Sequence, residues 1–397
     1  MPVINSLADL KTEAATWRHE LHQNPQTSYE ETFASGFVKQ KLDEWGITYK
    51  EGIAVTGVVA TIEGQKTSSG KAIGLRADMD ALNITEKTNL EHASKNPGKM
   101  HACGHDGHTA TLLATAKYLS ENRNFDGKVH LIFQPAEEGG KGAHTMIDEG
   151  LFKDFPCDYV FGYHNWPEMP KGHIGTKIGP LMAATDDIEI TVTGAGGHAS
   201  QPHLTIDSLY IASQIVIALQ GIISRMLDPV DTGVISITNF NAGSGANNII
   251  PEVATLTGTL RTYKQETRDK LKGKIESVTN NIAQAYDATV SINFTDGLDP
   301  TVNSADGVEI ALRAAQKVVP EDMIDGDCEP CMGAEDFGAY LTKVPGAFIF
   351  LGQREKEEGS PHNYGLHSPY YDFNNEIIPI ASSYFVAVVE EYMPLDK

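Results

Sequence analysis

The chain has 397 residues, and its 31 lysines and arginines against 53 aspartates and glutamates give a formal net charge of −22 at pH 7. This length allows about two or three domains, and a hydrophobic content of 41% is typical of a globular protein with a large core. A negative field of this size repels phosphate backbones and anionic lipid headgroups, so we expect neither nucleic acid nor a membrane as a partner.

Helical and strand-like patterns alternate along the first part of the chain. Apolar residues recur at helical spacing in residues 7–22, 33–45, the segment after residue 105, and 143–151. Short apolar runs typical of buried strands occupy residues 57–62, 73–77, 129–133 and 159–163. Strands separated by helices predict an α/β fold with a largely parallel sheet covered on both faces.

The pattern changes near residue 186. The order strand, helix, two strands, helix, strand predicts a ferredoxin-like unit, with segments at 188–194, 206–226, 234–240, 254–263, 266–286 and 289–294. Residues after 301 return to helix and strand. We therefore expect a catalytic domain built from residues 1–185 and 297–397, with residues 186–296 inserted as a second domain.

Residues 101–108 read HACGHDGH. Thiolate, imidazole and carboxylate occur together there and are the ligands that zinc-class metals take, so the segment predicts a metal site. An extended backbone would place His101, Cys103 and His105 on one side, whereas a helix would pair His105 with His108. The spacing leaves both arrangements open.

Other polar residues are expected at the carboxyl ends of the strands, where such sheets bind ligands. Glu137 and Glu138 follow the third apolar run, and His164 follows the fourth. Two adjacent carboxylates could divide the work, one binding metal and the other moving protons. His367, in the loop sequence GLHSPYYDF, is a candidate for a distant ligand.

Seven motifs occur in order along the chain: HACGHDGH, FQPAEEGGKGA, GYHNWP, GAGGHASQPH, NNIIPE, MGAEDF and LHSP. With these motifs the chain resembles the M20 family of metallopeptidases. It is most similar to the amidohydrolase branch, which includes N-acyl-amino-acid amidohydrolases, hippurate hydrolases and auxin-conjugate hydrolases. The resemblance covers essentially the whole chain. It implies a dinuclear-metal hydrolase domain with an inserted lid domain, through which a homodimer or higher homo-oligomer forms.

The resemblance also implies roles for particular residues. The metal ligands would be Cys103, His105, Glu138, His164 and His367. Glu137 would be the catalytic general base, and His198 would reach the reacting carbonyl, in several members from the partner subunit. Asn248 and Arg261 would bind the substrate carboxylate, with Arg261 supplying positive charge that the acidic chain otherwise lacks.

One motif departs from the wider family. Most branches have His-x-Asp after the second strand, whereas this chain reads LRADMD, with Arg76 at the histidine position and Asp78 at the aspartate position. The amidohydrolase branch shares this change and compensates with the cysteine of HACGHDGH. The resemblance implies two divalent metal ions, with zinc or manganese first and cobalt or nickel as alternatives. We expect Asp78 to orient a ligand.

The implied reaction is hydrolysis of the amide bond of N-acyl amino acids, with acetyl or aromatic acyl groups, to a carboxylic acid and a free amino acid. A metal-bound water would be the nucleophile. The same residues would also suit an N-acetyl-diaminopimelate-type deacetylase or a dipeptidase, and a non-enzymatic binding protein on this fold is a further alternative. The first residues lack a secretory-signal pattern and the four cysteines lack disulfide-framework spacing, so the expected location is the cytoplasm.

Overall fold

The structure is a computed structural model that describes residues 3–395. The chain folds into two compact units. The first consists of Met1–Leu181, Val302–Glu329 and Asp336–Lys397, and the second of Met182–Thr301 and Pro330–Glu335. The sequence places the domain boundaries after residues 185 and 296, and the main structural boundaries follow residues 181 and 301.

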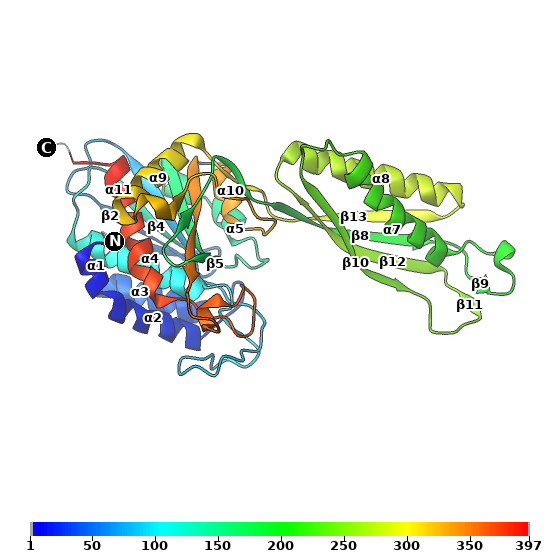
Figure 1. The fold of residues 1–397 in the computed structure, drawn as a ribbon, viewed down its shortest axis with the longest axis horizontal. Helices are drawn as coiled ribbons and strands as arrows, with labels where there is room; N and C mark the ends of the chain where they lie inside the picture. The colour runs from blue at the N-terminus through cyan, green and yellow to red at the C-terminus, as the bar shows by residue number, and fades with distance from the viewer. Residues whose placement is uncertain (1–2, 396–397) are drawn as a thin grey trace. The chain divides into compact units, whose positions relative to one another are not determined.

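Within the described residues, an eight-stranded sheet runs through the first unit (Figure 1). Its strands, in spatial order, are β1 (Tyr49–Ile53), β2 (Gly57–Glu63), β4 (Lys128–Gln134), β3 (Ala72–Asp78), β5 (Tyr159–Pro170), β16 (Gly346–Arg354), β6 (Ile174–Gly175) and β15 (Ile324–Asp325). The central strands β4, β3, β5 and β16 are parallel neighbours, which confirms the predicted α/β class. A separate pair is formed by β7 (Gly179–Met182) and β14 (Thr301–Asn303).

The strand β2 differs from the prediction, because it runs antiparallel to β4. A parallel arrangement requires a crossover connection, usually a helix. The segment between β2 and β3, residues 64–71, contains no helix, so the chain reverses direction there. The parallel part of the sheet therefore begins at β4.

Helices of the first unit surround this sheet. They are α1 (Asn5–Asp9), α2 (Lys11–Gln23), α3 (Thr32–Glu44), α4 (His105–Glu121), α5 (Gly142–Asp148), α6 (Leu151–Asp154), α9 (Ala305–Val318), α10 (Phe337–Leu341) and α11 (Ile378–Tyr392). α4 packs against α2 and α11, and α11 also packs against α9. Most side chains of α4 and α11 are buried, which explains why their sequences are apolar or small on nearly every face.

The second unit has the predicted ferredoxin-like order. Its sheet runs β10 (Gly233–Ala242), β12 (Val253–Thr262), β8 (Ala184–Thr193) and β13 (Thr289–Asp296), and every pair of neighbours is antiparallel. Two helices, α7 (Ser208–Arg225) and α8 (Gln265–Ala285), pack against this sheet and against each other. A short additional pair is formed by β9 (Gly197–His198) and β11 (Ile249–Ile250).

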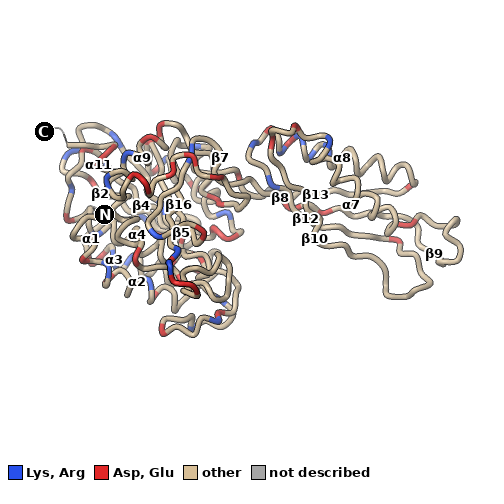
Figure 2. Tube along the Cα trace, in the orientation of Figure 1, with Lys and Arg blue, Asp and Glu red and all other residues tan. Residues whose placement is uncertain are grey.

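Both helices of the second unit have compositions that the packing explains. By length and composition alone, α7 could cross a membrane, but its apolar residues Ile211, Ile215 and Leu219 are buried in the core of this unit. Basic residues gather on α8 (Figure 2). Two of them, Arg268 and Lys272, bind the buried carboxylate of Asp186, with N–O distances of 2.7 Å. Part of the basic charge of α8 is therefore used to hold the helix on β8.

His130 on β4 predicts a pH dependence of stability. Its Nδ1 accepts the hydroxyl proton of Thr61 at 2.9 Å, and its Nε2–H donates to the carbonyl of Pro156 at 3.2 Å. Burial lowers the pKa of His130 from 6.5 to about 4. Between these values the unfolded chain takes up a proton that the folded chain does not, so the free energy of unfolding falls as the pH falls.

From pH 7 to pH 5 this histidine is expected to remove about 2 kcal/mol of stability, at about 1.4 kcal/mol for each pH unit below 6.5. A His130→Gln variant should lose about 2 kcal/mol less of its free energy of unfolding than the parent over the same pH interval, measured by urea denaturation at both pH values. If the variant and the parent lost equal stability, His130 would not be the group responsible for this pH dependence.

Candidate metal and active site

Two neighbouring parallel strands bring carboxylates to one edge of the sheet. β3 ends at Asp78, and Asp80 follows two residues further on. β4 ends at Gln134, and Glu137 and Glu138 follow three and four residues further on. All four side chains are buried or nearly so. This edge is the carboxyl end of the parallel strands, where the sequence predicts the site.

His164 comes from β5, the next strand along the sheet. The register pairs Leu75 of β3 with Phe161 of β5, so His164 lies level with Asp78, three residues further along each strand. The sequence predicts His164 at the end of its strand. In the structure β5 continues to Pro170, so His164 lies inside the strand. It still faces the site, because β3 stops at this level and leaves that edge of β5 open.

The HACGHDGH segment follows the helical alternative from His105 onwards, and His101 belongs to neither ligand set described below. Cys103 lies in an irregular segment, and α4 begins at His105, which places His108 one turn further along the helix. Gly104 between them has φ 98°, and a Cβ on it would lie 2.4 Å from Oδ1 of Asn165. Only glycine fits there, so Gly104 allows the flanking donors Cys103 and His105 to point to one place.

The structure gathers the five predicted ligands into two overlapping sets. The first set is Cys103, His105 and His164, and the second is Cys103, Glu138 and His367. Within each set, one donor atom of every member lies within 4.8 Å of a donor atom of each other member. Sγ of Cys103 lies 3.3 Å from Nε2 of His164, and Nε2 of His367 lies 3.2 Å from Oε1 of Glu138. Cys103 belongs to both sets, so one thiolate lies within reach of two candidate cation positions. By the same measure, His105, Glu137 and Glu138 form a further set, as do Asp78, His105 and His108.

Glu137 lies beside these sets. Its Oε2 and Oε1 of Glu138 are each 4.0 Å from Nε2 of His105. The two adjacent carboxylates therefore face the same histidine. Ala136, the residue before them, has φ 56°, in the left-handed region that residues other than glycine rarely adopt.

The charges of the site fit a divalent cation. Burial alone would lower the pKa of His105, but Asp78, Asp80 and Glu138 raise it to about 10. Burial also raises the pKa of the Cys103 thiol, and the carboxylates of Glu138, Glu137 and Asp78 raise it further. Nε2 of His105 is buried and has no hydrogen-bond partner among the described residues. A buried imidazole nitrogen surrounded by carboxylates but without a hydrogen-bond partner suits a divalent cation, which would take the place of its proton and neutralise the excess negative charge.

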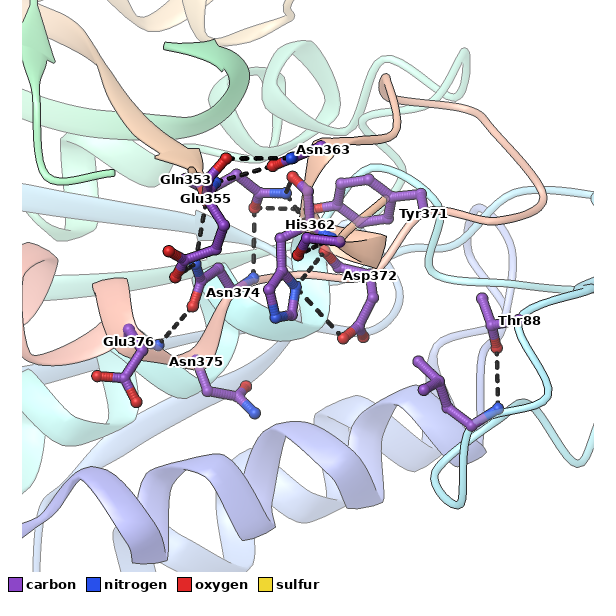
Figure 3. A network of polar contacts seen from close by, with 12 residues as sticks. Thr88, Gln353, Glu355, His362, Asn363, Tyr371, Asp372, Asn374, Asn375 and Glu376 are labelled. Atoms are coloured by element: carbon purple, nitrogen blue, oxygen red, sulfur yellow. Dashed lines mark hydrogen bonds and ion pairs between the residues drawn. The ribbon is translucent and has the colours of Figure 1, made fainter. Parts of the chain in front are cut away.

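The loop that carries His367 is tied down by a network of polar contacts from the end of β16 (Figure 3), and the N–H of His367 itself donates to the carbonyl of Ala102 at 2.8 Å. Nε2 of Gln353 donates to the carbonyl oxygens of His362 and Asp372, at 2.9 and 3.3 Å, and the side chain of Asn374 donates to the carbonyl of Gln353 at 3.0 Å. These contacts close the loop on either side of His367, whose own φ is 64°. The loop is therefore tied to the sheet, although its sequence has no regular pattern.

The three remaining predicted residues belong to the second unit. His198 lies on β9 directly opposite Ile249 of β11, and Ala199 N–H donates to the carbonyl of Asn248 at 2.9 Å. His198 and Asn248 are thus neighbours on an exposed edge. Arg261 lies on β12, half-buried, and donates to the side chain of Thr259.

Comparison with known proteins places the chain in a family. The model of peptidase family M20/M25/M40 matches residues 74–391. The chain belongs to this family. It is 42% identical to the hippurate hydrolase of Campylobacter jejuni, over 99% of this chain and 100% of that protein. It is 38% identical to the N-acetyl-L-cysteine deacetylase of Bacillus subtilis, over 96% and 88% of the two chains.

A solved structure of the same family supports the fold and the metal chemistry. A dinuclear metal-binding M20 peptidase from Bacillus subtilis superposes with a TM-score of 0.83 at 34% identity, covering 97% of this chain and 99% of that one. This family membership confirms the resemblance carried by the seven motifs. It agrees with the two ligand sets that share Cys103.

Arg76, at the position where the resemblance implies a histidine in most branches, is buried, and each of its three guanidinium nitrogens donates a hydrogen bond. It donates to Asp78 at 2.7 Å, to Gln134 at 2.8 Å and to Asp336 at 3.0 Å. Asp78 also accepts from His108 Nδ1 at 2.6 Å. Burial alone would raise the pKa of Asp78, but Arg76 and the neighbouring histidines lower it.

Asp80 also contacts a predicted ligand of this M20 chain, besides Asp78, which the sequence predicts and whose Oδ2 lies 3.6 Å from Nε2 of His105. His105 Nδ1–H donates to Asp80, 3.0 Å from the backbone carbonyl and 3.3 Å from Oδ1. Oδ2 of Asp80 accepts the backbone N–H of Glu138 at 2.9 Å. The motif LRADMD held a signal for this, since Asp80 shares the strand-face spacing of Asp78.

Replacing Asp80 by alanine is expected to lower metal affinity by about tenfold, the lower end of the usual effect of losing a partner that orients a metal ligand. Alanine keeps the backbone carbonyl that His105 contacts at 3.0 Å, but it removes the Oδ1 contact with His105 and the acceptor of the Glu138 N–H. The affinity is measured by competition with a chromogenic zinc chelator. Asp126→Ala is the matched control, because Asp126 also accepts a backbone N–H, that of Ser69, but lies outside both ligand sets. Equal affinities in the two variants would contradict the role of Asp80.

Proposed function

We propose that this chain is a metal-dependent amidohydrolase that cleaves N-acyl amino acids, with acetyl or aromatic acyl groups, to a carboxylic acid and a free amino acid. The observation that carries the proposal is the pair of ligand sets joined at Cys103, with Glu137 beside them. The named activities of the relatives, on hippurate and on N-acetylcysteine, support this substrate class.

Two divalent ions are the proposed cofactors. One would be held by Cys103, His105 and His164, and the other by Cys103, Glu138 and His367. When bound, such ions polarise the amide carbonyl and lower the pKa of water towards about 7. Thiolate and imidazole donors favour zinc, with manganese as the second choice and cobalt or nickel as alternatives.

The protein's own groups would complete the reaction. Glu137 takes the proton of the attacking water and later returns it to the leaving amine. Ser200 N–H donates to Nδ1 of His198 at 3.1 Å, so the ring proton of His198 lies on Nε2 and can donate to the carbonyl oxygen as it becomes negative. Arg261 and Asn248 would bind the substrate carboxylate.

Replacing His198 by alanine is expected to lower kcat by about 10²- to 10³-fold, the usual cost of one donor to a developing oxyanion. Bound metal should not change, because the ligand sets lie in the first unit. Mixing this variant with inactive Glu137→Gln protein tests whether the histidine acts on the partner subunit. Recovered activity supports a shared site in a homodimer formed through the second unit, and no recovery argues for a histidine of the same chain.

Metal analysis combined with a substrate panel tests the function itself. The panel contains acetyl, benzoyl and indole-acetyl amino acids, together with N-acetyl-diaminopimelate and dipeptides. We expect hydrolysis of the N-acyl amino acids and its loss after chelation. Preference for a diamino acid or dipeptide would support the alternative enzymes, and no hydrolysis with two metal ions bound would support a binding protein.

We also propose a cytoplasmic location. Cys103, Cys157, Cys328 and Cys331 are all free in the structure, as in a reducing compartment. Four cysteines without a disulfide support the location predicted from the cysteine spacing.

A further inference from the structure

We infer that Glu31 is a positioning residue for the carboxylate pair Glu137 and Glu138, and that it acts by holding the backbone of Ala136 in its left-handed conformation. The inference rests on the proposed roles of these two glutamates. Glu31 immediately precedes α3 and is fully buried, although it is 105 residues from Ala136 in sequence. Nothing in its local sequence requires a buried carboxylate.

Both oxygens of the Glu31 carboxylate accept hydrogen bonds. Oε1 accepts the backbone N–H groups of Ala136 and Tyr29, each at 2.9 Å, and Oε2 accepts the hydroxyl of Thr56 at 2.6 Å. The two backbone groups can only donate, so only an acceptor can satisfy them. An apolar side chain at position 31 would leave a buried N–H of Ala136 without a partner.

Ala136 is where this contact has its effect. Its φ of 56° is unfavourable for a residue with a Cβ, so the surrounding contacts must maintain it. Glu31 holds its N–H, and Gly142 N–H donates to its carbonyl at 3.0 Å. Because the next two residues are Glu137 and Glu138, relaxation of this one φ angle would turn both carboxylates away from His105.

The segment that carries Glu31 also contacts the far side of the same loop. The hydroxyl of Tyr29 donates to the carbonyl of Gly140 at 2.5 Å, and the hydroxyl of Ser28 donates to Oδ2 of Asp80 at 3.3 Å. Residues 28–31 thus contact the loop that carries Glu137 and Glu138 at both ends. They also reach Asp80, which orients His105.

The test compares Glu31→Met with Glu31→Gln. Glutamine keeps a carbonyl oxygen for the two N–H groups and an amide for the Thr56 hydroxyl, whereas methionine keeps neither. We expect Glu31→Met to lower kcat by about ten- to a hundredfold with little change in KM, and Glu31→Gln to stay within about threefold of the parent. Glu31→Met should also weaken zinc binding in chelator competition, since Glu138 lies on the same loop.

A second readout does not depend on activity. Hydrogen exchange of the metal-free protein, followed by mass spectrometry, should be faster for the peptide that spans residues 133–140 in Glu31→Met than in Glu31→Gln. Adding Ala136→Gly to Glu31→Met should recover kcat, because glycine adopts positive φ without strain. A role in overall stability alone would not produce that recovery.

The chain offers a matched control in Glu149. Its Oε2 accepts the N–H of Ala54 at 2.7 Å, and Ala54 also has a positive φ, 51°, but it lies in the turn before β2. Glu149→Met should therefore leave kcat unchanged. A folded Glu31→Met protein with parental kcat and exchange, or a Glu31→Gln protein as impaired as Glu31→Met, overturns the inference. An active Glu137→Gln protein would instead overturn the proposed role of Glu137 as general base. A metal-loaded parent that hydrolyses no N-acyl amino acid would overturn the proposed function, and the exchange measurement would still test the role of Glu31.

Discussion

Replacing Cys103 by alanine is expected to remove both metal ions and reduce hydrolysis to background. Cys103 belongs to both ligand sets, so one substitution takes a ligand from each ion. If each ion has about four ligands and a total binding free energy of 10–16 kcal/mol, as for structural zinc, each ligand contributes about 3 kcal/mol. The affinity of the protein for each ion would then fall by more than about a hundredfold.

Metal content after dialysis against a dilute chelator is the measurement, with turnover as the second readout. Cys157→Ala is the matched control, because Cys157 also lies in the first unit and burial raises its pKa to about 12, but it is outside both sets. Loss of a single ion from Cys103→Ala would show that the thiolate serves one site only. Retention of both ions would exclude it as a ligand.

Replacing Glu137 by glutamine is expected to lower kcat by about 10³-fold while two metal ions remain bound. The side chain keeps its shape but can no longer accept a proton, and a well-placed general base contributes about 10²–10⁴ to rate. Glu137 lies 4.0 Å from His105 but is not a member of either set that shares Cys103. It does share a set with His105 and Glu138, but glutamine keeps an oxygen at this position, so we expect both ions to stay in place.

Glu138→Gln provides the comparison for Glu137. The two residues are adjacent carboxylates at the same end of β4, yet Glu138 pairs with His367 at 3.2 Å and belongs to a ligand set. We expect Glu138→Gln to lose metal and Glu137→Gln to lose turnover only. Near-parental kcat in Glu137→Gln would require another base.

Much of the fold followed from local patterns, and the exceptions have local causes. The predicted helix over residues 7–22 divides at Leu10 into α1 and α2, a boundary that apolar spacing does not mark. The direction of β2 depends on the absence of a helix in the connection to β3, and not on the apolar run itself. Apolar periodicity reports which residues are buried, but it carries no information on strand direction.

The sequence by itself determined the candidate donors, because residues such as Cys103 with His105 and Glu137 with Glu138 lie in short segments next to buried strands. The full set, with His367, was implied by the resemblance of the seven motifs to the M20 family. Only the tertiary structure decided what holds those groups in place. Glu31, Asp80 and Gln353 are ordinary polar residues in sequence, and each acquires its role from a partner brought close by folding. A hydrogen bond needs two atoms within about 3 Å, and for segments distant in sequence only the packed chain sets that distance.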